Sequence, residues 1–158
     1  MTLMTLGYEG LDVHAFLGEL KANRVATLVD VRELPLSRKK GFSKSTLAAE
    51  AKAVGIEYVH FPALGCPREI RKDYYGDRDW GRYKKRFNAY LHKQNTELER
   101  LRALAEKQVC CLVCFEADYR LCHRSLITAA LAGEGRMQIR HLAVRSPASF
   151  AGLEAAFA

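Results

Sequence analysis

The densest group of reactive side chains lies in residues 114–124, which read CFEADYRLCHR. Thiols, carboxylates and an imidazole can act as nucleophiles or as general acids and bases. The candidate catalytic residues of this segment are therefore Cys114, Glu116, Asp118, Cys122 and His123. Arg124 is a candidate for substrate binding, because a guanidinium makes paired hydrogen bonds to phosphate or carboxylate groups.

Two other interpretations of this segment stay open. In the first, Cys114 is a small core residue and Arg124 forms a structural ion pair with Asp118. In the second, Cys114 and Arg120 have the Cys-x5-Arg spacing, which resembles the phosphate-binding loop of cysteine phosphatases. The carboxylates of Glu116 and Asp118 would repel a phosphate dianion in such a loop. The glycines that let backbone amides converge on a phosphate are also missing.

The thiols and histidines raise the question of a metal site. Cys111 and Cys114 are three residues apart on a predicted strand, so their side chains point to opposite faces. A metal ion could instead be bound by Cys114, Cys122 and His123, with His60 or Cys66 as a fourth ligand. No standard zinc spacing is present, so we assign no metal ligand and predict no cofactor.

A second group of candidates ends the apolar run at residues 28–33, which read LVDVRE. Asp30 and Arg32 share one face of this strand, while Val31 points to the other. We expect Asp30 to act as an acid or base or to orient a base, and Arg32 and Arg38 to bind an anionic substrate. The alternative is an Asp–Arg pair that steadies the following loop. The DVR run resembles a segment of rhodanese-like domains, whose catalytic cysteine also follows a later strand.

A third group surrounds the two glycines of the segment GYEG at residues 7–10. Glycines allow the backbone to approach a ligand closely, so we expect Tyr8 and Glu9 to face the substrate. A plain strand-to-helix turn is the equally simple alternative. His60, at the end of a later predicted strand, completes the set of candidate binding residues.

These groups lie at the ends of predicted strands. Apolar and β-branched runs predict strands at residues 2–6, 25–31, 56–61, 109–115 and 137–144. Apolar residues at helical spacing predict helices after Asp12, between Ser43 and Gly55, over residues 80–91, from a Thr96–Glu99 capping box, and over residues 122–131. The aromatic stripe within residues 80–91 is expected to face the core.

Alternating strands and helices predict the α/β class. We expect a single domain over residues 1–158, with a mainly parallel sheet of about five strands and helices on both faces, in Rossmann-like or rhodanese-like layering. Residues 145–158 form a weakly specified C-terminal tail. In open α/β sheets, ligands bind beyond the carboxyl ends of the strands, where all three groups of candidates fall.

Composition narrows the classes of protein that are compatible with the chain. It has 158 residues, of which 49% are hydrophobic and 27% charged, as in ordinary globular proteins. No stretch approaches the roughly 20 apolar residues of a membrane span. The N-terminus lacks the basic flank and apolar run of a signal peptide, so we expect a cytoplasmic protein. Five cysteines, four of them within residues 110–122, are then expected to be thiols.

The net charge of +7 is unevenly distributed. Residues 32–93 contain 15 basic and 7 acidic residues, a net charge of +8, and the rest of the chain carries −1. A concentrated positive field attracts phosphates, which predicts an anionic small molecule or a nucleic acid as partner. The oligomeric state is not indicated by the sequence.

Taken together, five motifs resemble those of domain-of-unknown-function family 488. In chain order they are LGYEG at 6–10, LVDVR at 28–32, SR at 37–38 with GFS at 41–43, YVHFPALG at 58–65, and CFEAD at 114–118 with CHR at 122–124. The resemblance runs from about Leu3 to Leu142 and implies a small, mainly bacterial α/β protein with these motifs around one cleft. It implies no particular activity.

We therefore expect a hydrolase or transferase whose strand-end cleft of carboxylates, thiols and arginines acts on a nucleotide, a nucleic acid or another phosphate-bearing substrate. Glycosidic-bond chemistry with Glu116 is one concrete form of this hypothesis. The first alternative is a cysteine-dependent enzyme of the sulfurtransferase or phosphatase type that uses Cys114 or Cys122. The second is a basic nucleic-acid-binding module without catalysis.

Overall fold

The computed structural model describes residues 1–133 and 135–144, and the tail predicted at 145–158 lies outside them. In the described part, five strands form one parallel sheet, as predicted. The strands are β1 (Thr2–Gly7), β2 (Thr27–Asp30), β3 (Glu57–His60), β4 (Cys110–Cys114) and β5 (Gln138–His141). Their order in the sheet is β3-β2-β4-β1-β5. Every residue of β4 is buried, consistent with its central place and its apolar sequence.

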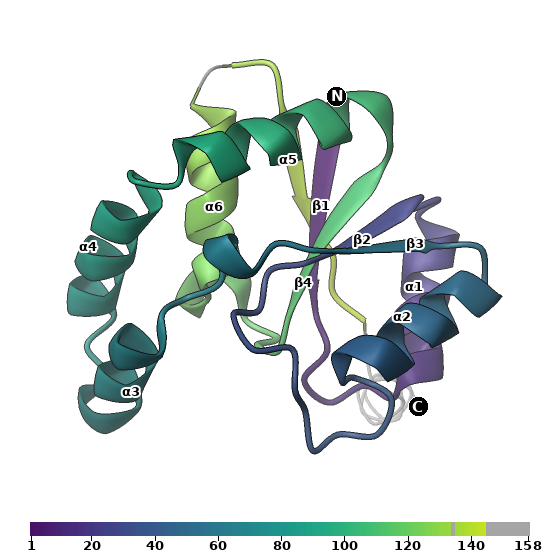
Figure 1. Cartoon of the computed structure of the whole chain (residues 1–158), viewed down its shortest axis with the longest axis horizontal. Coiled ribbons are helices and arrows are strands. Elements are labelled where there is room, and N and C mark those ends of the chain that lie inside the picture. Colours follow the sequence, from purple (N-terminus) through teal and green to yellow (C-terminus); the bar gives the residue numbers. More distant parts are fainter. Residues whose placement is uncertain (134, 145–158) are drawn as a thin grey trace, which may run out of the picture.

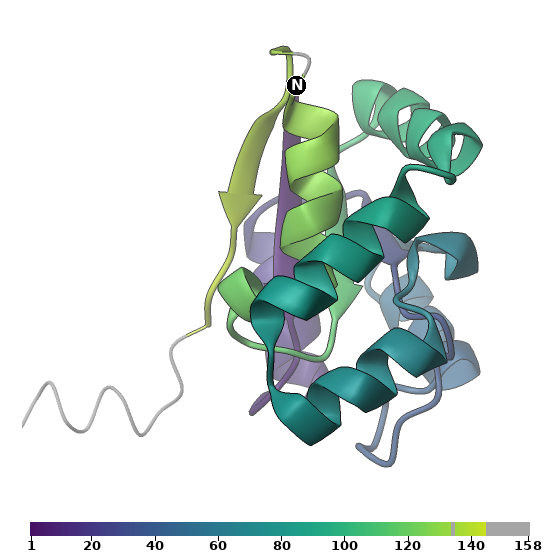
Figure 2. The same ribbon diagram turned by 90° about the vertical axis from the view of Figure 1, so that its left-hand side faces the viewer.

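Helices cover both faces of this sheet (Figure 1). One face carries α1 (Val13–Ala22) and α2 (Lys44–Ala53), and the other carries α5 (Asn95–Lys107) and α6 (His123–Ala132). Two further helices, α3 (Arg68–Asp77) and α4 (Trp80–Leu91), lie in front of α6 in the view of Figure 2. Short 3-10 helices cover Pro62–Leu64 and Tyr119–Leu121. Within the described residues, no helix combines the length and apolarity needed to cross a bilayer.

The alternation of side chains along β4 builds two separate cores. Cys110, Leu112 and Cys114 join the core beneath α3–α6. Cys111 and Val113 join the core beneath α1 and α2. The prediction that Cys111 and Cys114 point to opposite faces is therefore confirmed.

The ends of the helices follow the sequence signals only in part. Asp12 caps α1 as predicted, with its Oδ1 accepting a hydrogen bond from Ala15 N at 2.8 Å. The Thr96–Glu99 capping box is wrong, because α5 already begins at Asn95 and Thr96 lies inside its first turn. Ser43 precedes α2 but makes no capping bond; its hydroxyl bonds the backbone of Ser37 instead.

Helix α3 was not predicted, whereas the stripe of α4 behaves as expected. In α3 the sequence REIRKDYYGD buries only Ile70, so it lacks an apolar period. In α4, Tyr83, Phe87 and Leu91 are buried in the core that faces α6. The α3–α4 pair is closed by aromatic contacts, with the rings of Tyr74 and Tyr83 5.1 Å apart.

Register brings the carboxyl ends of four strands to one edge of the sheet. Gly7 at the end of β1 pairs with Cys114 at the end of β4. Asp30 at the end of β2 pairs with His60 of β3 and Val113 of β4. The three groups of candidate residues are therefore neighbours in space, as the strand-end rule predicts.

Candidate active site

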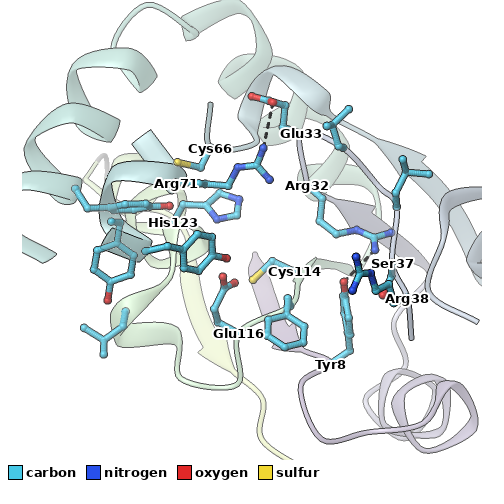
Figure 3. A pocket seen from close by; sticks show the side chains of 17 residues that line it. Tyr8, Arg32, Glu33, Ser37, Arg38, Cys66, Arg71, Cys114, Glu116 and His123 are labelled. Carbon is cyan, nitrogen blue, oxygen red and sulfur yellow. Dashed lines mark hydrogen bonds and ion pairs between the residues drawn. The ribbon is translucent and has the colours of Figure 1, made fainter. Parts of the chain in front are cut away.

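A cavity of about 310 Å³ opens at this edge of the sheet. Its walls come from the loops after β1, β2 and β4, from α3 and α4, and from the start of α6. Figure 3 shows His123 and Arg71 on one side, Arg32 and Arg38 on the other, and Cys114 with Glu116 between them. Six of the twelve predicted site residues line the cavity, namely Tyr8, Arg32, Arg38, Cys114, Glu116 and His123.

Cys114 occupies the end of β4 and contacts two other predicted site residues. Its Sγ lies 2.8 Å from Sγ of Cys122 and 2.9 Å from Nη1 of Arg124. The Arg124 side chain is 0% exposed and also donates to Thr5 Oγ1 at 3.1 Å, to the carbonyl of Glu116, and to the carbonyl of Ala117 at 3.2 Å. The interpretation in which Arg124 pairs with Asp118 is therefore wrong.

The environment of Arg124 is unusual for a buried charge. A guanidinium stays protonated in proteins, and a buried charge is costly unless an opposite charge compensates it. Within the described part of the chain, its hydrogen-bond partners are carbonyls, a hydroxyl and sulfur, and none is a carboxylate. Burial acts to lower the pKa of Arg124, but the Cys114 and Cys122 sulfurs outweigh it and the pKa is raised. The Arg124 guanidinium can therefore form an ion pair only with a negatively charged sulfur among these partners.

Cys122 and His123 form the buried wall behind Cys114. Cys122 is 2% exposed, and burial raises the pKa of its thiol well above the ordinary value. His123 Nε2 lies 2.7 Å from the carbonyl oxygen of Val31, which only accepts hydrogen bonds, so Nε2 carries a hydrogen. Burial lowers the pKa of His123, which favours a neutral ring whose Nδ1, 3.7 Å from Cys122 Sγ, is an acceptor.

Three of the proposed metal ligands do converge. The donor atoms of Cys114, Cys122 and His123 lie within 4.8 Å of one another. His60, one of the two proposed fourth ligands, is instead engaged through Nε2 with the carbonyl of Arg32 at 2.7 Å. The guanidinium of Arg124, 2.9 Å from Cys114 Sγ, would repel a cation at this place. We therefore treat the cluster as a thiol site.

Asp30 and Arg32 share a face and form a buried ion pair. Nη2 of Arg32 lies 2.7 Å from Oδ2 of Asp30, and the two side chains are 8% and 0% exposed. Arg32 also donates to the carbonyl of Phe42 at 2.6 Å and to the hydroxyl of Tyr8 at 3.1 Å. The Tyr58 hydroxyl donates to Asp30, and burial followed by this bond raises the pKa of Tyr58. Asp30 thus holds Arg32 and the loop after β2 in place and does not line the cavity.

A family model described as domain of unknown function DUF488 matches residues 12–131, about three quarters of the chain. The chain belongs to the DUF488 family. The resemblance drawn from the motifs is therefore confirmed. The matched range contains the cavity residues from β2 to α6, whereas Tyr8 and Glu9 precede it. The chain matches no curated protein and no solved structure at a significant level.

In this DUF488 protein, three further predicted residues lie outside the cavity, and each contacts one of the loops around it. Asp118 pairs with Arg120 at 2.9 Å on the surface. Glu9 accepts a hydrogen bond from Ala117 N at 3.0 Å, which ties the loop after β4 to the loop after β1. His60 supports the Arg32 carbonyl, as described above. Because Arg120 is 74% exposed and turned toward Asp118, the Cys-x5-Arg phosphate loop does not form.

Several residues of the cavity were not assigned to it by the sequence. Arg71, Tyr74 and Tyr75 come from α3, Tyr83 comes from α4, and Glu33 and Cys66 come from loops. Arg71 Nη2 pairs with Glu33 Oε1 at 3.3 Å across the cavity wall (Figure 3). Burial raises the pKa of the Cys66 thiol to about 11. The pair of adjacent tyrosines after Pro67 was the available signal for this wall.

Large apolar side chains surround the mouth of the cavity. Five of those that line it are well exposed: Leu34 (55%), Leu36 (76%), Tyr75 (58%), Phe115 (44%) and Leu121 (45%). Exposed apolar groups gathered around a polar cavity are typical of a binding site. A ligand of this site would therefore combine an apolar or aromatic part with an anionic part.

Proposed function

We propose that this DUF488 protein is an enzyme, a transferase or hydrolase, in which the Cys114 thiolate attacks a phosphate-bearing substrate held in the strand-end cavity. The observation that supports this proposal is the fully buried Arg124, whose hydrogen-bond partners among residues 1–133 and 135–144 include the Cys114 sulfur and no carboxylate. A thiolate at Cys114 compensates the buried charge, and the thiolate is the nucleophilic form of cysteine.

The neighbouring thiols differ from Cys114 in ways that favour it as the nucleophile. Cys66 lines the same cavity, but burial raises its pKa to about 11, so it stays protonated near neutral pH. Cys122 is as buried as Cys114, but it does not line the cavity. Cys114 alone of the three combines contact with a guanidinium and a position on the cavity wall. A reducing compartment such as the cytoplasm would keep this thiol free.

The substrate class follows from the groups opposite Cys114. Arg38 and Arg71 face the cavity from its two sides, and guanidinium groups bind phosphate oxygens in pairs. The exposed rings of Tyr75 and Phe115 lie at the mouth, where a nucleobase can stack on them. These features together favour a nucleotide or the end of a nucleic acid among phosphate-bearing ligands.

Attack on phosphorus itself is disfavoured by the loop after β4. A cysteine phosphatase needs backbone amides that converge on the phosphate, but here Ala117 N donates to Glu9 and Arg120 N donates to Asp118. We therefore place the attack at a carbon or sulfur atom of the ligand. Glu116, the carboxylate beside Cys114 in Figure 3, is then placed to act as a base that accepts a proton from the group that displaces the Cys114 sulfur.

Alkylation of the native protein tests this proposal. At pH 7, iodoacetamide should label Cys114 faster than free cysteine and faster than Cys66, as read by peptide mass spectrometry. Replacing Arg124 by glutamine should slow labelling of Cys114 roughly ten- to hundredfold, because a hydrogen bond to a charged group contributes about 1.5–3 kcal/mol. The Arg124→Lys variant keeps the charge and should recover part of the rate if the variant is folded by circular dichroism.

Two results would overturn the proposal. The first is labelling of Cys114 in the folded wild-type protein at or below the rate of free cysteine. The second is an equal rate in the folded Arg124→Gln variant and the wild type. For the substrate class, AMP should protect Cys114 from alkylation more strongly than adenosine, because only AMP offers a phosphate to Arg38 and Arg71. Equal protection by the two would contradict phosphate recognition.

A further inference from the structure

Two thiols, Cys114 and Cys122, touch at the base of the cavity. Their Sγ atoms are 2.8 Å apart, and both cysteines are free. A disulfide requires a sulfur–sulfur distance of about 2.05 Å, so the two atoms need to approach by less than about 1 Å to bond. In the proposed function, Cys114 is the nucleophile and pairs with Arg124, but Cys122 has no role.

The two thiols are not equivalent. Both side chains are almost fully buried, Cys114 at 1% and Cys122 at 2% exposed, but only Cys114 of the two lines the cavity. Arg124 donates to Cys114, whereas Cys122 has the carboxylate oxygen Oε2 of Glu116 at 3.4 Å. A reagent in the cavity therefore meets Cys114 first, and Cys122 keeps its proton until a neighbouring base removes it. Dithiol redox sites have this arrangement, with one thiol that attacks the substrate and a second, less accessible thiol that resolves the mixed disulfide.

We propose that Cys122 is the resolving thiol of Cys114, and that the site reduces an organic disulfide that carries an anionic group. This inference rests on the proposed nucleophilic role of Cys114. It adds a substrate class to the same cavity: disulfides whose carboxylate or phosphate groups pair with Arg38 and Arg71.

The reaction is a pair of thiol–disulfide exchanges. The Cys114 thiolate attacks one sulfur of the substrate R–S–S–R′, which breaks that bond, releases R′S⁻ and leaves a mixed disulfide between Cys114 and R–S. The Cys122 thiol then passes its proton to the Glu116 carboxylate and attacks the Cys114 sulfur, which releases RS⁻. The substrate gains two electrons, and the protein keeps a Cys114–Cys122 disulfide. An external thiol reductant returns the protein to its dithiol form by the same exchange in reverse.

The contacts of Arg124 favour return to the dithiol form. Its guanidinium is fully buried and pairs with the Cys114 sulfur. In the disulfide, that sulfur has no negative charge, so the buried guanidinium loses its compensation. An external thiol can therefore reduce the Cys114–Cys122 disulfide easily, and the dithiol is expected to reduce mainly disulfides with stable thiolate leaving groups, such as aromatic disulfides.

The test uses 5,5′-dithiobis(2-nitrobenzoate), an aromatic disulfide with a carboxylate on each ring. The wild-type protein should release both thionitrobenzoate groups from each reagent molecule consumed at the site, and mass spectrometry should find a Cys114–Cys122 disulfide with no aryl group attached. The Cys122→Ser variant should release one thionitrobenzoate at a similar initial rate and retain the other on Cys114. The Cys110→Ala variant is the matched control, because it removes a buried thiol of β4 outside the cavity and should behave as the wild type.

Each other outcome decides against the inference. If the wild type keeps the aryl group on Cys114 for as long as Cys122→Ser does, Cys122 does not resolve and only this inference fails. If Cys114 is resolved by Cys66, peptide mapping shows that disulfide and again only this inference fails. If Cys114 does not react in the folded wild type, while the unfolded chain does, the nucleophilic role fails and the proposed function with it.

Discussion

Replacing Gly7 by alanine tests whether the loop after β4 must lie directly against β1. A Cβ at Gly7 would be 1.8 Å from the carbonyl oxygen of Glu116 and 2.5 Å from its carbonyl carbon. Since Cβ atoms do not come within 3.0 Å of such atoms, the main chain at Glu116 has to retreat by about 1.2 Å. The same carbonyl accepts a hydrogen bond from Arg124, so the shift disturbs the pairing of Arg124 with Cys114.

The loss of stability expected for Gly7→Ala is large because the added Cβ would meet main-chain atoms. Overpacking costs about 1–3 kcal/mol, and the upper end is expected because no side chain can rotate away. For a chain of about 150 residues, each kcal/mol lowers the melting temperature by roughly 2–4 °C, so a loss of about 6–12 °C is expected. A displacement of about 1 Å in a catalytic group can cost about a hundredfold in rate, and alkylation of Cys114 reports the disturbance directly.

Thermal unfolding and iodoacetamide labelling of the folded protein measure these two effects. The matched control is Gly18→Ala, because Gly18 lies inside α1 with no atom within 4 Å of the added Cβ. That variant should be more stable than the wild type by about 0.5–1 kcal/mol, since alanine replaces glycine in a helix interior. A Gly7→Ala protein with wild-type melting temperature and wild-type labelling of Cys114 would refute the reasoning.

Three further predictions concern the surroundings of the cavity. Asp30→Asn removes one partner of the buried pair with Arg32 and should cost about 3–5 kcal/mol in urea unfolding; a loss below about 1 kcal/mol would contradict the structural role of this pair. Arg120→Ala should leave the melting temperature and the labelling of Cys114 unchanged, because Arg120 is 74% exposed and bonded to Asp118. Reduced labelling would instead support the interpretation in which Cys114 and Arg120 form a Cys-x5-Arg phosphate loop. Burial raises the pKa of Cys66 from 9.0 to about 11, so its alkylation should rise with pH up to about 11. Its contribution to the free energy of unfolding should fall between those two pH values, because the unfolded thiol ionises first; labelling that levels off near pH 9.0 would show that burial is not the cause.

The centre of the sheet could be predicted because strands β2 and β4 have no exposed side. Residues 27–30 and 110–114 are entirely buried, and such runs are long enough to be strands and too short for helices. The parallel arrangement then placed the residues after β1, β2 and β4 at one edge without any knowledge of strand order. For this reason Tyr8, Arg32, Cys114 and His123 were predicted together.

The features that the sequence did not predict, helix α3 and the partner of Cys114, depend on packing between segments that have no apolar periodicity. Helix α3 buries one residue, Ile70, so its apolar pattern could not reveal the wall that carries Arg71. Sequence spacing could not distinguish Arg120 from Arg124 as the partner of Cys114 either. The turn at Tyr119–Leu121 bends the chain back so that Cys122 and Arg124 face β4 and Arg120 faces solvent.

The structure also changes the meaning of the uneven charge. In the sequence, the basic excess of residues 32–93 is separate from the reactive segment 114–124. In the folded chain the two meet at one cavity, because Arg38 and Arg71 come from the first segment and Cys114 and Glu116 from the second. Arg124 is fully buried and compensated by sulfur, so it is not available to bind a substrate anion. The proposed function therefore assigns recognition of the anion and activation of the thiol to different arginines, and it predicts that an Arg38 variant weakens binding while the intrinsic reactivity of Cys114 is unchanged.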